Sequence, residues 1–515
     1  MPAGAEGVSF MVRHCSMMGG ERVTDAFVPA LDRHPWSPRR ALGALRTSGS
    51  MACATRYFSF CGLPVMTLSH SRIAHALPVP SAEALKASEQ LTAHITAEIG
   101  RVGGWIPFSR YMEMALYEPG LGYYSNPGMV FGSAGDFVTA PELTPLFGAT
   151  LARQVAPWLR DPALAGDGPM VLEVGAGTGM LAAQLLNALD NAGFSGLRYR
   201  ILELSAERRE QQRQTLMSLA PGLLPRVQWL TDFPERFAGV VVANELLDAM
   251  PVQIFEWRAG KGGSTRGDVK GHASEKAARD MSGAGVEDAP AARTAGTVAA
   301  GVGVGPSGEQ VYEMGVGLAD DGAFVWVPRP ADAALNGAVA TVRAELGEVQ
   351  AAAWPTPYRS EICPAQQGWI RTLAERMTAG TVLLLDYGFA APEYYHPQRS
   401  QGTLMCHYRH HSHTEPFLWP GLNDITAHVD FSGLARAATA AGFSLLGYTS
   451  MAAFLMNAGV LDELAELPRE PEQFWFAQAQ AVQQLISEAE MGALFKVIAF
   501  ERGMQAPVSA FGFGD

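Results

Sequence analysis

Apolar runs of strand length alternate with stretches of helical periodicity over most of the chain. Met170–Val174 is a short apolar run, which predicts a buried strand, and 180–189 after it places apolar residues at helical spacing. Similar runs predict six more strands, at 199–204, 226–230, 239–243, 381–387, 443–449 and 495–502. Helices are predicted between them, at 206–219, 335–354, 365–377, 431–441, 451–458 and 471–487. This alternation, ending in a pair of strands, predicts an α/β fold with a seven-stranded sheet.

Two groups of elements are predicted outside that alternation. Before the first strand, 81–100 has a plausible N-cap at Ser81 and a regular apolar face, which predict a helix. In 106–124, Pro119 and Gly120 separate a helix from a tight turn. The segment at 251–257 alternates and is predicted to be a strand, with which 310–317 and 323–327 are expected to pair. We therefore expect an N-terminal helical extension and inserted elements around the core.

Three glycines on alternate positions connect the first strand to its helix. Gly175, Gly177 and Gly179 form a strand–turn–helix context in which glycines admit a tight turn and a close ligand. The helix N-terminus that follows offers unpaired N–H groups. With Glu173 before it, the turn resembles motif I of the class I S-adenosylmethionine-dependent methyltransferases, E/D-x-G-x-G-x-G. The spacing differs from the G-x-G-x-x-G of dinucleotide binders, although an ordinary βα turn can also carry such glycines.

Polar residues follow the ends of the next predicted strands. Glu203 ends the second strand, where a carboxylate can bind a ribose diol, although a solvated charge would also occur there. Asp232 follows the third strand and either accepts from an adenine amino group or caps a helix. Asn244 and Glu245 follow the fourth strand, and Asp386 follows the fifth. Because ligands bind at the carboxyl ends of parallel strands, these residues are expected to line one crevice.

Several longer segments resemble the MidA family of methyltransferases. They are 108–111 with 117–124, GDFVTAPELTPLFG at 135–148, NELLD at 244–248, LLLDYG at 383–388 and DITAHVDF at 424–431. The resemblance covers roughly 81–503, and GDFVTAPE is its most diagnostic part. It implies a Rossmann-like class I methyltransferase that uses S-adenosyl-L-methionine. Mitochondrial members of this family are respiratory complex I assembly factors that methylate arginine, so the resemblance also implies a protein substrate.

Candidate site residues follow from the motifs and this resemblance. The expected cofactor-binding residues are Glu173, Gly175, Gly177, Gly179, Glu203, Asp232, Asn244 and Asp136. The expected catalytic residues are Glu245, Asp248 and Asp386, with Asp136 as a further candidate. Glu245 and Asp248 lie three residues apart and can face one side of a turn, where paired carboxylates would orient a charged guanidinium. Capping or loop hydrogen bonding remains the alternative role for each acid.

Composition excludes several classes of function. The formal net charge of −13 argues against a general nucleic-acid-binding protein, which needs a basic surface. The 5 cysteines form no C-x-x-C pair, so neither a disulfide framework nor a zinc site is indicated. Histidines cluster at 407–413, but their spacing matches no zinc motif, and no metal is expected. No apolar run reaches the length of a membrane span.

The chain divides into seven predicted parts. These are an N-terminal extension at 1–80, expected to be disordered, a helical segment at 81–165, the cofactor-binding half at 166–258, a disordered Gly/Ala-rich insertion at 259–307, an inserted hairpin with helices at 308–380, the second half of the core at 381–503 and a tail at 504–515. Within the second half, 389–430 is predicted to be a long, irregular, substrate-facing lid. Residues 1–80 resemble a mitochondrial transit peptide in composition, but an extension from an upstream start is favoured.

Competing functions remain open at the sequence level. A small-molecule methyltransferase is one alternative, although the large polar lid favours a protein substrate. A non-catalytic assembly chaperone is another, against which the intact glycine motif and Glu203 argue. A Rossmann dehydrogenase is disfavoured by the glycine spacing. The predicted location is the cytoplasm of a bacterium, with the mitochondrial matrix as the alternative.

Overall fold

The computed structural model describes residues 77–125, 138–166, 168–259 and 309–514. The predicted disorder of most of the N-terminal extension and of the Gly/Ala-rich insertion lies outside the described residues. So does Asp136, one of the predicted site residues. Among the described residues, no helix combines the length and apolarity that crossing a membrane requires.

The core sheet has the strand order β15-β16-β10-β5-β2-β3-β4. Its strands are β2 (Met170–Val174), β3 (Arg198–Leu202), β4 (Val227–Leu230), β5 (Phe237–Asn244), β10 (Met377–Phe389), β15 (Ser444–Ser450) and β16 (Phe495–Arg502). All neighbours pair in parallel except β16, which is antiparallel to both β10 and β15. The short strand β14 (Val429–Asp430) pairs in parallel with the last residues of β10. The seven-stranded class I methyltransferase layout predicted from the sequence is confirmed.

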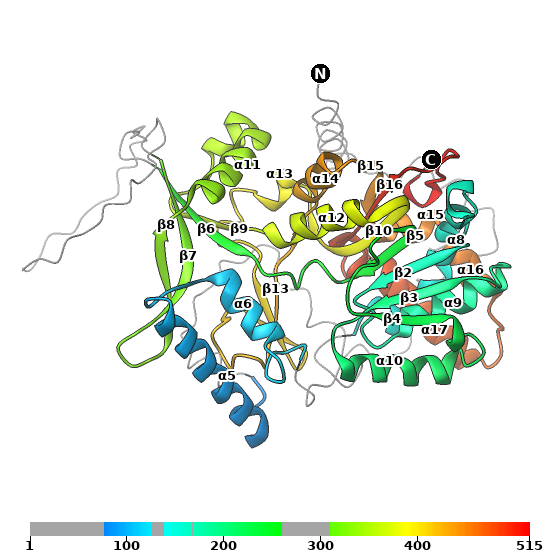
Figure 1. Ribbon diagram of the computed structural model, residues 1–515, viewed down its shortest axis with the longest axis horizontal. Helices are drawn as coiled ribbons and strands as arrows, with labels where there is room; N and C mark the ends of the chain where they lie inside the picture. Colours follow the sequence, from blue (N-terminus) through cyan, green and yellow to red (C-terminus); the bar gives the residue numbers. More distant parts are fainter. Residues whose placement is uncertain (1–76, 126–137, 167, 260–308, 515) are drawn as a thin grey trace, which may run out of the picture.

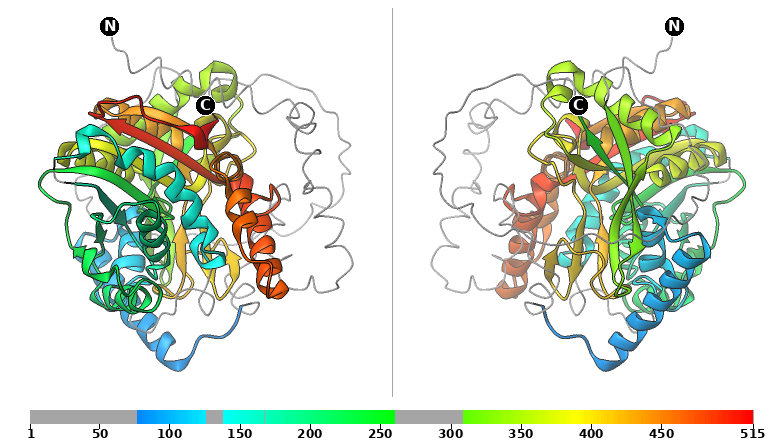
Figure 2. Two further views of the ribbon diagram at one scale, coloured as in Figure 1. Left: turned by 90° about the vertical axis from the view of Figure 1, so that its right-hand side faces the viewer. Right: turned by 90° about the vertical axis from the view of Figure 1, so that its left-hand side faces the viewer.

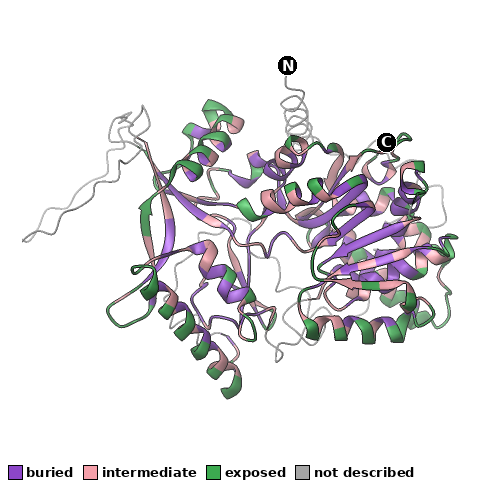
Figure 3. Cartoon of the chain, in the orientation of Figure 1, coloured by how far each residue is buried: buried purple, intermediate pink, exposed green. Residues whose placement is uncertain are grey.

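Helices cover both faces of the core sheet, which explains why its central strands are apolar throughout. Along β5, Val240 and Val242 face one apolar cluster, whereas Val241 and Ala243 face another. The first cluster is covered by α8 (Leu146–Leu159), α9 (Met180–Asn191), α15 (Met451–Asn457), α16 (Val460–Glu466) and α17 (Glu472–Ile486). The second is covered by α12 (Pro364–Arg376) and α14 (Phe431–Ala440). Figure 2 shows α15–α17, in orange and red, on one side of the sheet, and Figure 3 shows the strands buried between the layers.

A second, antiparallel sheet lies beside the core sheet (Figure 1). It has the order β1-β7-β6-β9, with β8 paired to β7. Its strands are β1 (Ile106–Pro107), β6 (Gln253–Arg258), β7 (Gln310–Leu318), β8 (Phe324–Pro330) and β9 (Tyr358–Ile362). The helices α5 (Ala82–Arg101), α6 (Phe108–Tyr117) and α11 (Ala333–Ala352) pack against it. The predicted pairing of 310–317 with 251–257 is confirmed as β7 with β6, whereas 323–327 forms β8, which pairs with β7 and not with β6 as predicted. Strand β9 was not predicted.

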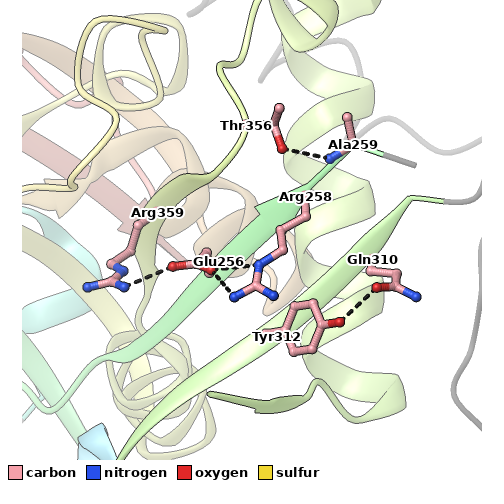
Figure 4. A network of polar contacts seen from close by, with 7 residues as sticks. All are labelled: Glu256, Arg258, Ala259, Gln310, Tyr312, Thr356 and Arg359. Carbon is pink, nitrogen blue, oxygen red and sulfur yellow. Dashed lines mark hydrogen bonds and ion pairs between the residues drawn. The ribbon is translucent and has the colours of Figure 1, made fainter. Parts of the chain in front are cut away.

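An ion-pair network joins the strands of the second sheet (Figure 4). Glu256 on β6 is buried and accepts hydrogen bonds from Arg258 at 2.6 Å and from Arg359, on β9, at 2.8 Å. Burial alone would raise the pKa of Glu256, but the two guanidinium groups hold it below its ordinary value. The paired charges therefore fix the β6–β9 register near the edge of this sheet.

The prediction of an irregular segment at 389–430 is wrong. The segment contains α13 (Ala391–Tyr394) and a small sheet, β12-β11-β13, made of β11 (Met405–Tyr408), β12 (His411–His413) and β13 (Asp424–Thr426). These strands were not predicted because they are short and the segment is rich in polar and aromatic residues. Pairing between them satisfies the backbone hydrogen-bonding groups of the segment. Figure 1 shows β13 between the two larger sheets. This position brings residues of the segment to the carboxyl ends of the core strands.

Candidate active site

The glycine turn, 175–179, leaves an open approach to the backbone. Gly175, Gly177 and Gly179 have φ values of 71°, 51° and 83°, a region that favours glycine. A side chain built on Gly177 would meet no atom within 4 Å, so ligand atoms can reach the backbone there. At Gly179, by contrast, a Cβ would lie 3.0 Å from the Cα of Gln212. Gly179 is the N-cap residue of α9, and the turn therefore presents the N-terminus of that helix.

Glu203 lies beside the turn, just beyond the end of β3. Its side chain is 9% exposed, and its Oε1 accepts a hydrogen bond from the backbone N–H of Ser205 at 3.0 Å. Its Oε2 accepts from Nε2 of Gln212 at 3.1 Å. Because each carboxylate oxygen has two acceptor positions, the group retains capacity for ligand hydroxyls.

Glu173 lies on β2 beneath the turn rather than at its open side. It is 2% exposed and accepts a hydrogen bond from the Tyr199 hydroxyl at 2.5 Å. Burial raises the pKa of Glu173 to about 7, against the effect of this hydrogen bond. The structure therefore brings Glu173 to the strand that supports the turn and not to the face that a ligand approaches.

Asp232 and Asn244 follow the ends of β4 and β5. Asp232 is exposed, and its Oδ1 accepts from the backbone N–H of Phe233 at 2.7 Å. No helix begins in the described residues between β4 and β5, so the predicted alternative of a helix cap is wrong. Asn244 donates from Nδ2 to Oε1 of Glu245 at 2.9 Å. The Oδ1 of Asn244 is buried and has no hydrogen-bond donor among the described residues. A buried acceptor without a donor favours binding of a ligand that can donate a hydrogen bond to it.

Glu245 combines an unusual backbone with a perturbed side chain. Its φ is 53°, which is rare for a residue other than glycine, and its N–H donates to the Leu385 carbonyl at 2.9 Å. Its carboxylate accepts from Asn244 and from the backbone N–H of Ala140. Burial, together with the negative charges of Asp386 and Glu142, raises the pKa of Glu245 to about 8 despite these hydrogen bonds. A strained backbone conformation together with a shifted carboxyl pKa is typical of a functional residue.

Asp386 holds the loop that carries the other acids. It is 1% exposed, and its Oδ2 accepts from the backbone N–H groups of Leu246, Leu247 and Asp248 at 3.1, 2.7 and 3.3 Å. Burial raises the pKa of Asp386 to about 7, although these hydrogen bonds act against the increase. Of the two roles that the sequence left open, the geometry favours loop hydrogen bonding over contact with a substrate.

Asp248 and Asp424 lie close to Glu245 and Asp386, so four acidic residues form one cluster. Asp248 is 5% exposed, and burial, followed by the charges of Asp386, Asp424 and Glu245, raises its pKa well above the ordinary value. Asp424 lies on β13, and its Oδ1 accepts from the Tyr124 hydroxyl at 2.8 Å. We call these four residues the acidic cluster. Asp424 and Tyr124 were not predicted, although both lie in segments that resemble the MidA family.

The diagnostic GDFVTAPE segment contacts the glycine turn. Thr139 and Glu142 form a capping box at α7 (Ala140–Leu143). Oε1 of Glu142 also accepts from the Thr178 hydroxyl, in the turn, at 3.2 Å. Together with the Ala140–Glu245 hydrogen bond, this contact places the start of α7 between the turn and the acidic cluster. Glu142 lies in a segment that resembles the MidA family, but it was not predicted to be a site residue.

The histidine-rich stretch at 407–413 forms a hairpin. His413 hydrogen-bonds through Nε2 to Oδ1 of Asn423 at 2.9 Å, and burial lowers the pKa of His407 to about 4. Within the ranges that the structure describes, no three His, Cys, Asp or Glu side chains are grouped so as to hold a metal ion.

The arrangement fits S-adenosyl-L-methionine. Backbone is accessible at Gly177, Glu203 can accept from ribose hydroxyls, and the unpaired Oδ1 of Asn244 can accept from an ammonium group. The acidic cluster lies at the same edge of the sheet, where it can bind a cation beside the cofactor.

Comparisons with known proteins agree with this geometry. Residues 150–449 match the family described as "Putative S-adenosyl-L-methionine-dependent methyltransferase". A protein from Burkholderia thailandensis, solved with S-adenosyl-homocysteine bound, is 44% identical with a TM-score of 0.69, over 85% of this chain and 98% of that one. The mouse mitochondrial protein arginine methyltransferase NDUFAF7 is 27% identical over 393 residues, 69% of this chain and 71% of its own length. The Caenorhabditis elegans homologue is 25% identical over 359 residues, 65% of this chain and 68% of that protein. The MidA resemblance is thereby confirmed, and the chain belongs to this family of S-adenosyl-L-methionine-dependent methyltransferases.

Proposed function

We propose that this enzyme methylates arginine side chains of a protein substrate and that the acidic cluster binds the acceptor guanidinium. The observation that carries the proposal is the concentration of buried carboxylates beside the glycine turn, with Asp248 5% exposed and near Asp386, Asp424 and Glu245. A cationic ligand stabilises the ionised form of these buried acids, whose pKa values are raised in its absence, and arginine remains charged at neutral pH. The names of the mouse and nematode relatives, both protein arginine methyltransferases, support this choice of acceptor.

The cofactor assignments are part of the same proposal. Backbone groups of Gly175, Gly177 and Gly179 contact the cofactor, Glu203 accepts from its ribose hydroxyls, and Asp232 accepts from its adenine amino group. Asn244 accepts from its ammonium group through the unpaired Oδ1. Glu173 acts indirectly, by supporting β2 through Tyr199. When bound, the cofactor supplies an electrophilic methyl group on a sulfonium.

The acids have separate proposed roles. Glu245 and Asp248 bind and orient the guanidinium through charge-assisted hydrogen bonds. Asp386 holds their loop through three backbone N–H groups. Methylation of a guanidinium nitrogen requires that this nitrogen lose one proton. Glu245 accepts that proton in its ionised form, which a pKa raised to about 8 makes a stronger base than an ordinary glutamate.

The test is transfer of an isotopically labelled methyl group from S-adenosyl-L-methionine to proteins of a cell extract. Acid hydrolysis and mass spectrometry identify the labelled amino acid, and labelled methylarginine is expected. The variants Gly177→Val and Glu245→Gln are the controls, and both should remove the label. Label that appears only in small molecules would instead support a small-molecule methyltransferase.

The acceptor protein that we propose is a subunit of respiratory complex I, as the MidA resemblance implies. For the compartment, we propose the cytoplasm of a bacterium, because identity to the Burkholderia protein is 44% and identity to the mouse mitochondrial protein is 27%. Labelling of purified complex I subunits tests the first point, and cell fractionation tests the second.

A further inference from the structure

Gln212 connects three segments that surround the cofactor site. It lies on α10 (Ala206–Leu219), a polar helix on which Gln212 and Leu216 are the buried residues. Its side chain is 0% exposed. Its amide hydrogen-bonds to the Gly177 carbonyl at 3.1 Å, to Oε2 of Glu203 at 3.1 Å and to Nε1 of Trp229 at 2.8 Å. One side chain thus joins the glycine turn, the end of β3 and the end of β4.

The partners determine which way the amide points. The indole Nε1–H of Trp229 can only donate, so it must meet the amide oxygen of Gln212. The amide nitrogen then faces two acceptors, the Gly177 carbonyl and the carboxylate of Glu203. Both amide hydrogens are used. Glutamate at this position would set a second carboxylate against these acceptors, and an apolar side chain would leave them without a donor.

We propose that Gln212 is a positioning residue for the cofactor, which orients the Glu203 carboxylate toward the ribose hydroxyls and thereby sets ribose selectivity. The inference rests on the proposed ribose-binding role of Glu203. Oε1 of Glu203 is held by the Ser205 N–H and Oε2 by Gln212, so the two contacts fix the carboxylate plane. Without Gln212, the carboxylate can rotate, and its hydrogen bonds to two adjacent hydroxyls lose their alignment. The contact with the Gly177 carbonyl links the same residue to the open part of the turn.

The decisive measurement compares two ligands in two proteins. Isothermal titration gives the Kd of S-adenosyl-L-methionine and of its 2′-deoxyribose analogue, for the wild type and for Gln212→Met. The wild type should prefer the natural cofactor by about tenfold or more, as expected for hydrogen bonds to a charged group. In Gln212→Met, affinity for the natural cofactor should fall by about tenfold, whereas affinity for the analogue should change little. The ratio of the two dissociation constants should therefore approach one. The KM for the cofactor should rise accordingly, with kcat at saturation nearly unchanged.

Gln214→Met is the matched control, because Gln214 lies on the same helix but is exposed and contacts Glu210. It should leave both dissociation constants unchanged. If thermal unfolding shows that Gln212→Met is not folded, Trp229→Phe replaces it, since that change removes the donor that orients the amide. An unchanged ligand ratio in the folded variant would overturn the inference.

Glu203→Gln separates this inference from the assignment on which it rests. If Glu203→Gln keeps the full preference for ribose, the ribose-binding role of Glu203 is wrong, and the inference falls with it. If Glu203→Gln loses the preference while Gln212→Met keeps it, only the positioning role of Gln212 is overturned. Loss of the preference in both variants, with Gln214→Met unaffected, supports the inference.

Discussion

At the scale of single residues, the carboxylate of Glu245 is the most direct test of the acceptor site. Glu245→Gln keeps the size of the side chain and removes its charge. We expect kcat/KM for the acceptor to fall by about a hundredfold or more, the usual effect of losing a charged partner in the transition state. Cofactor Kd should stay within about threefold of the wild type, a change below 1 kcal/mol. Transfer at the wild-type rate would exclude Glu245 from the mechanism.

The pH dependence of transfer follows from the same residue. With a pKa of about 8, the carboxyl group of Glu245 is largely protonated below that pH and can neither pair with a guanidinium nor accept its proton. We therefore expect kcat/KM for the acceptor to rise with pH up to about 8 and then to level. Rate profiles of the wild type and of Glu245→Gln check this expectation. A rise of the same shape in both proteins would assign the ionisation to another group.

Glu173 gives a prediction for stability rather than for activity. Its pKa is about 7 in the folded protein, above the ordinary 4.5, so folding favours the protonated form. The free energy of unfolding should therefore fall as pH rises from about 4.5 through about 7. In Glu173→Gln this loss is absent, so the variant should exceed the wild type at pH 8 by up to about 3 kcal/mol and match it at pH 4. Urea unfolding at the two pH values measures the difference, and parallel pH dependence in both proteins would contradict it.

The sequence predicted individual site residues where they follow a recognisable strand. Glu203, Asn244 and Glu245 were predicted because parallel strands end at one edge of the sheet. Asp424 and Tyr124 could not be found in this way, since they reach the site from a separate small sheet and from an N-terminal turn. Gln212 was not predicted for a different reason. Nothing in the sequence of a polar helix indicates that one of its glutamine side chains is buried.

At the scale of elements, the glycine turn should tolerate no side chain at Gly177. Gly177→Val places a branched side chain in the space that the cofactor needs and strains a backbone with a φ of 51°. We expect cofactor binding to be lost in isothermal titration while the protein remains folded by circular dichroism. Gly193→Val is the matched control, since Gly193 has a φ of 91° and open surroundings but follows α9 at its far end. Equal loss of binding in both variants would indicate strain rather than occlusion.

Elements of the core were predictable because their burial leaves long apolar runs. β5 and β10 are buried on both faces, and their sequences are apolar over most of their length. β9, with the sequence YRSEI, was missed because its partly charged pattern depends on partners such as Glu256, which pairs with Arg359. The strands β11–β13 were missed for a similar reason, since three-residue and four-residue strands give no periodicity to read.

At the scale of the whole molecule, the proposed active site lies where separate parts of the fold meet. The core sheet supplies the glycine turn, Glu203 and Glu245. The small sheet supplies Asp424, and the turn after α6 supplies Tyr124, whose hydroxyl binds Asp424 at 2.8 Å. The Tyr117 hydroxyl also donates to the Ala249 carbonyl, just beyond Asp248, at 3.0 Å. The small sheet and the turn after α6 therefore both lie at the proposed acceptor position.

The position of Asp424 predicts that its substitution changes the kinetics with the acceptor and leaves the affinity for the cofactor unchanged. Asp424→Asn keeps an acceptor for the Tyr124 hydroxyl but removes one negative charge from the acidic cluster. We expect kcat/KM for the acceptor to fall by about tenfold, with cofactor Kd unchanged, since one charged partner of the guanidinium is weakened. Tyr124→Phe should have a smaller effect of the same kind, because it releases the carboxylate without removing it. Steady-state kinetics with labelled cofactor, combined with titration of cofactor binding, measure both quantities. A change in cofactor Kd with unaltered acceptor kinetics would mean that the small sheet serves the cofactor half, and the acceptor would then have to be held by the core strands alone.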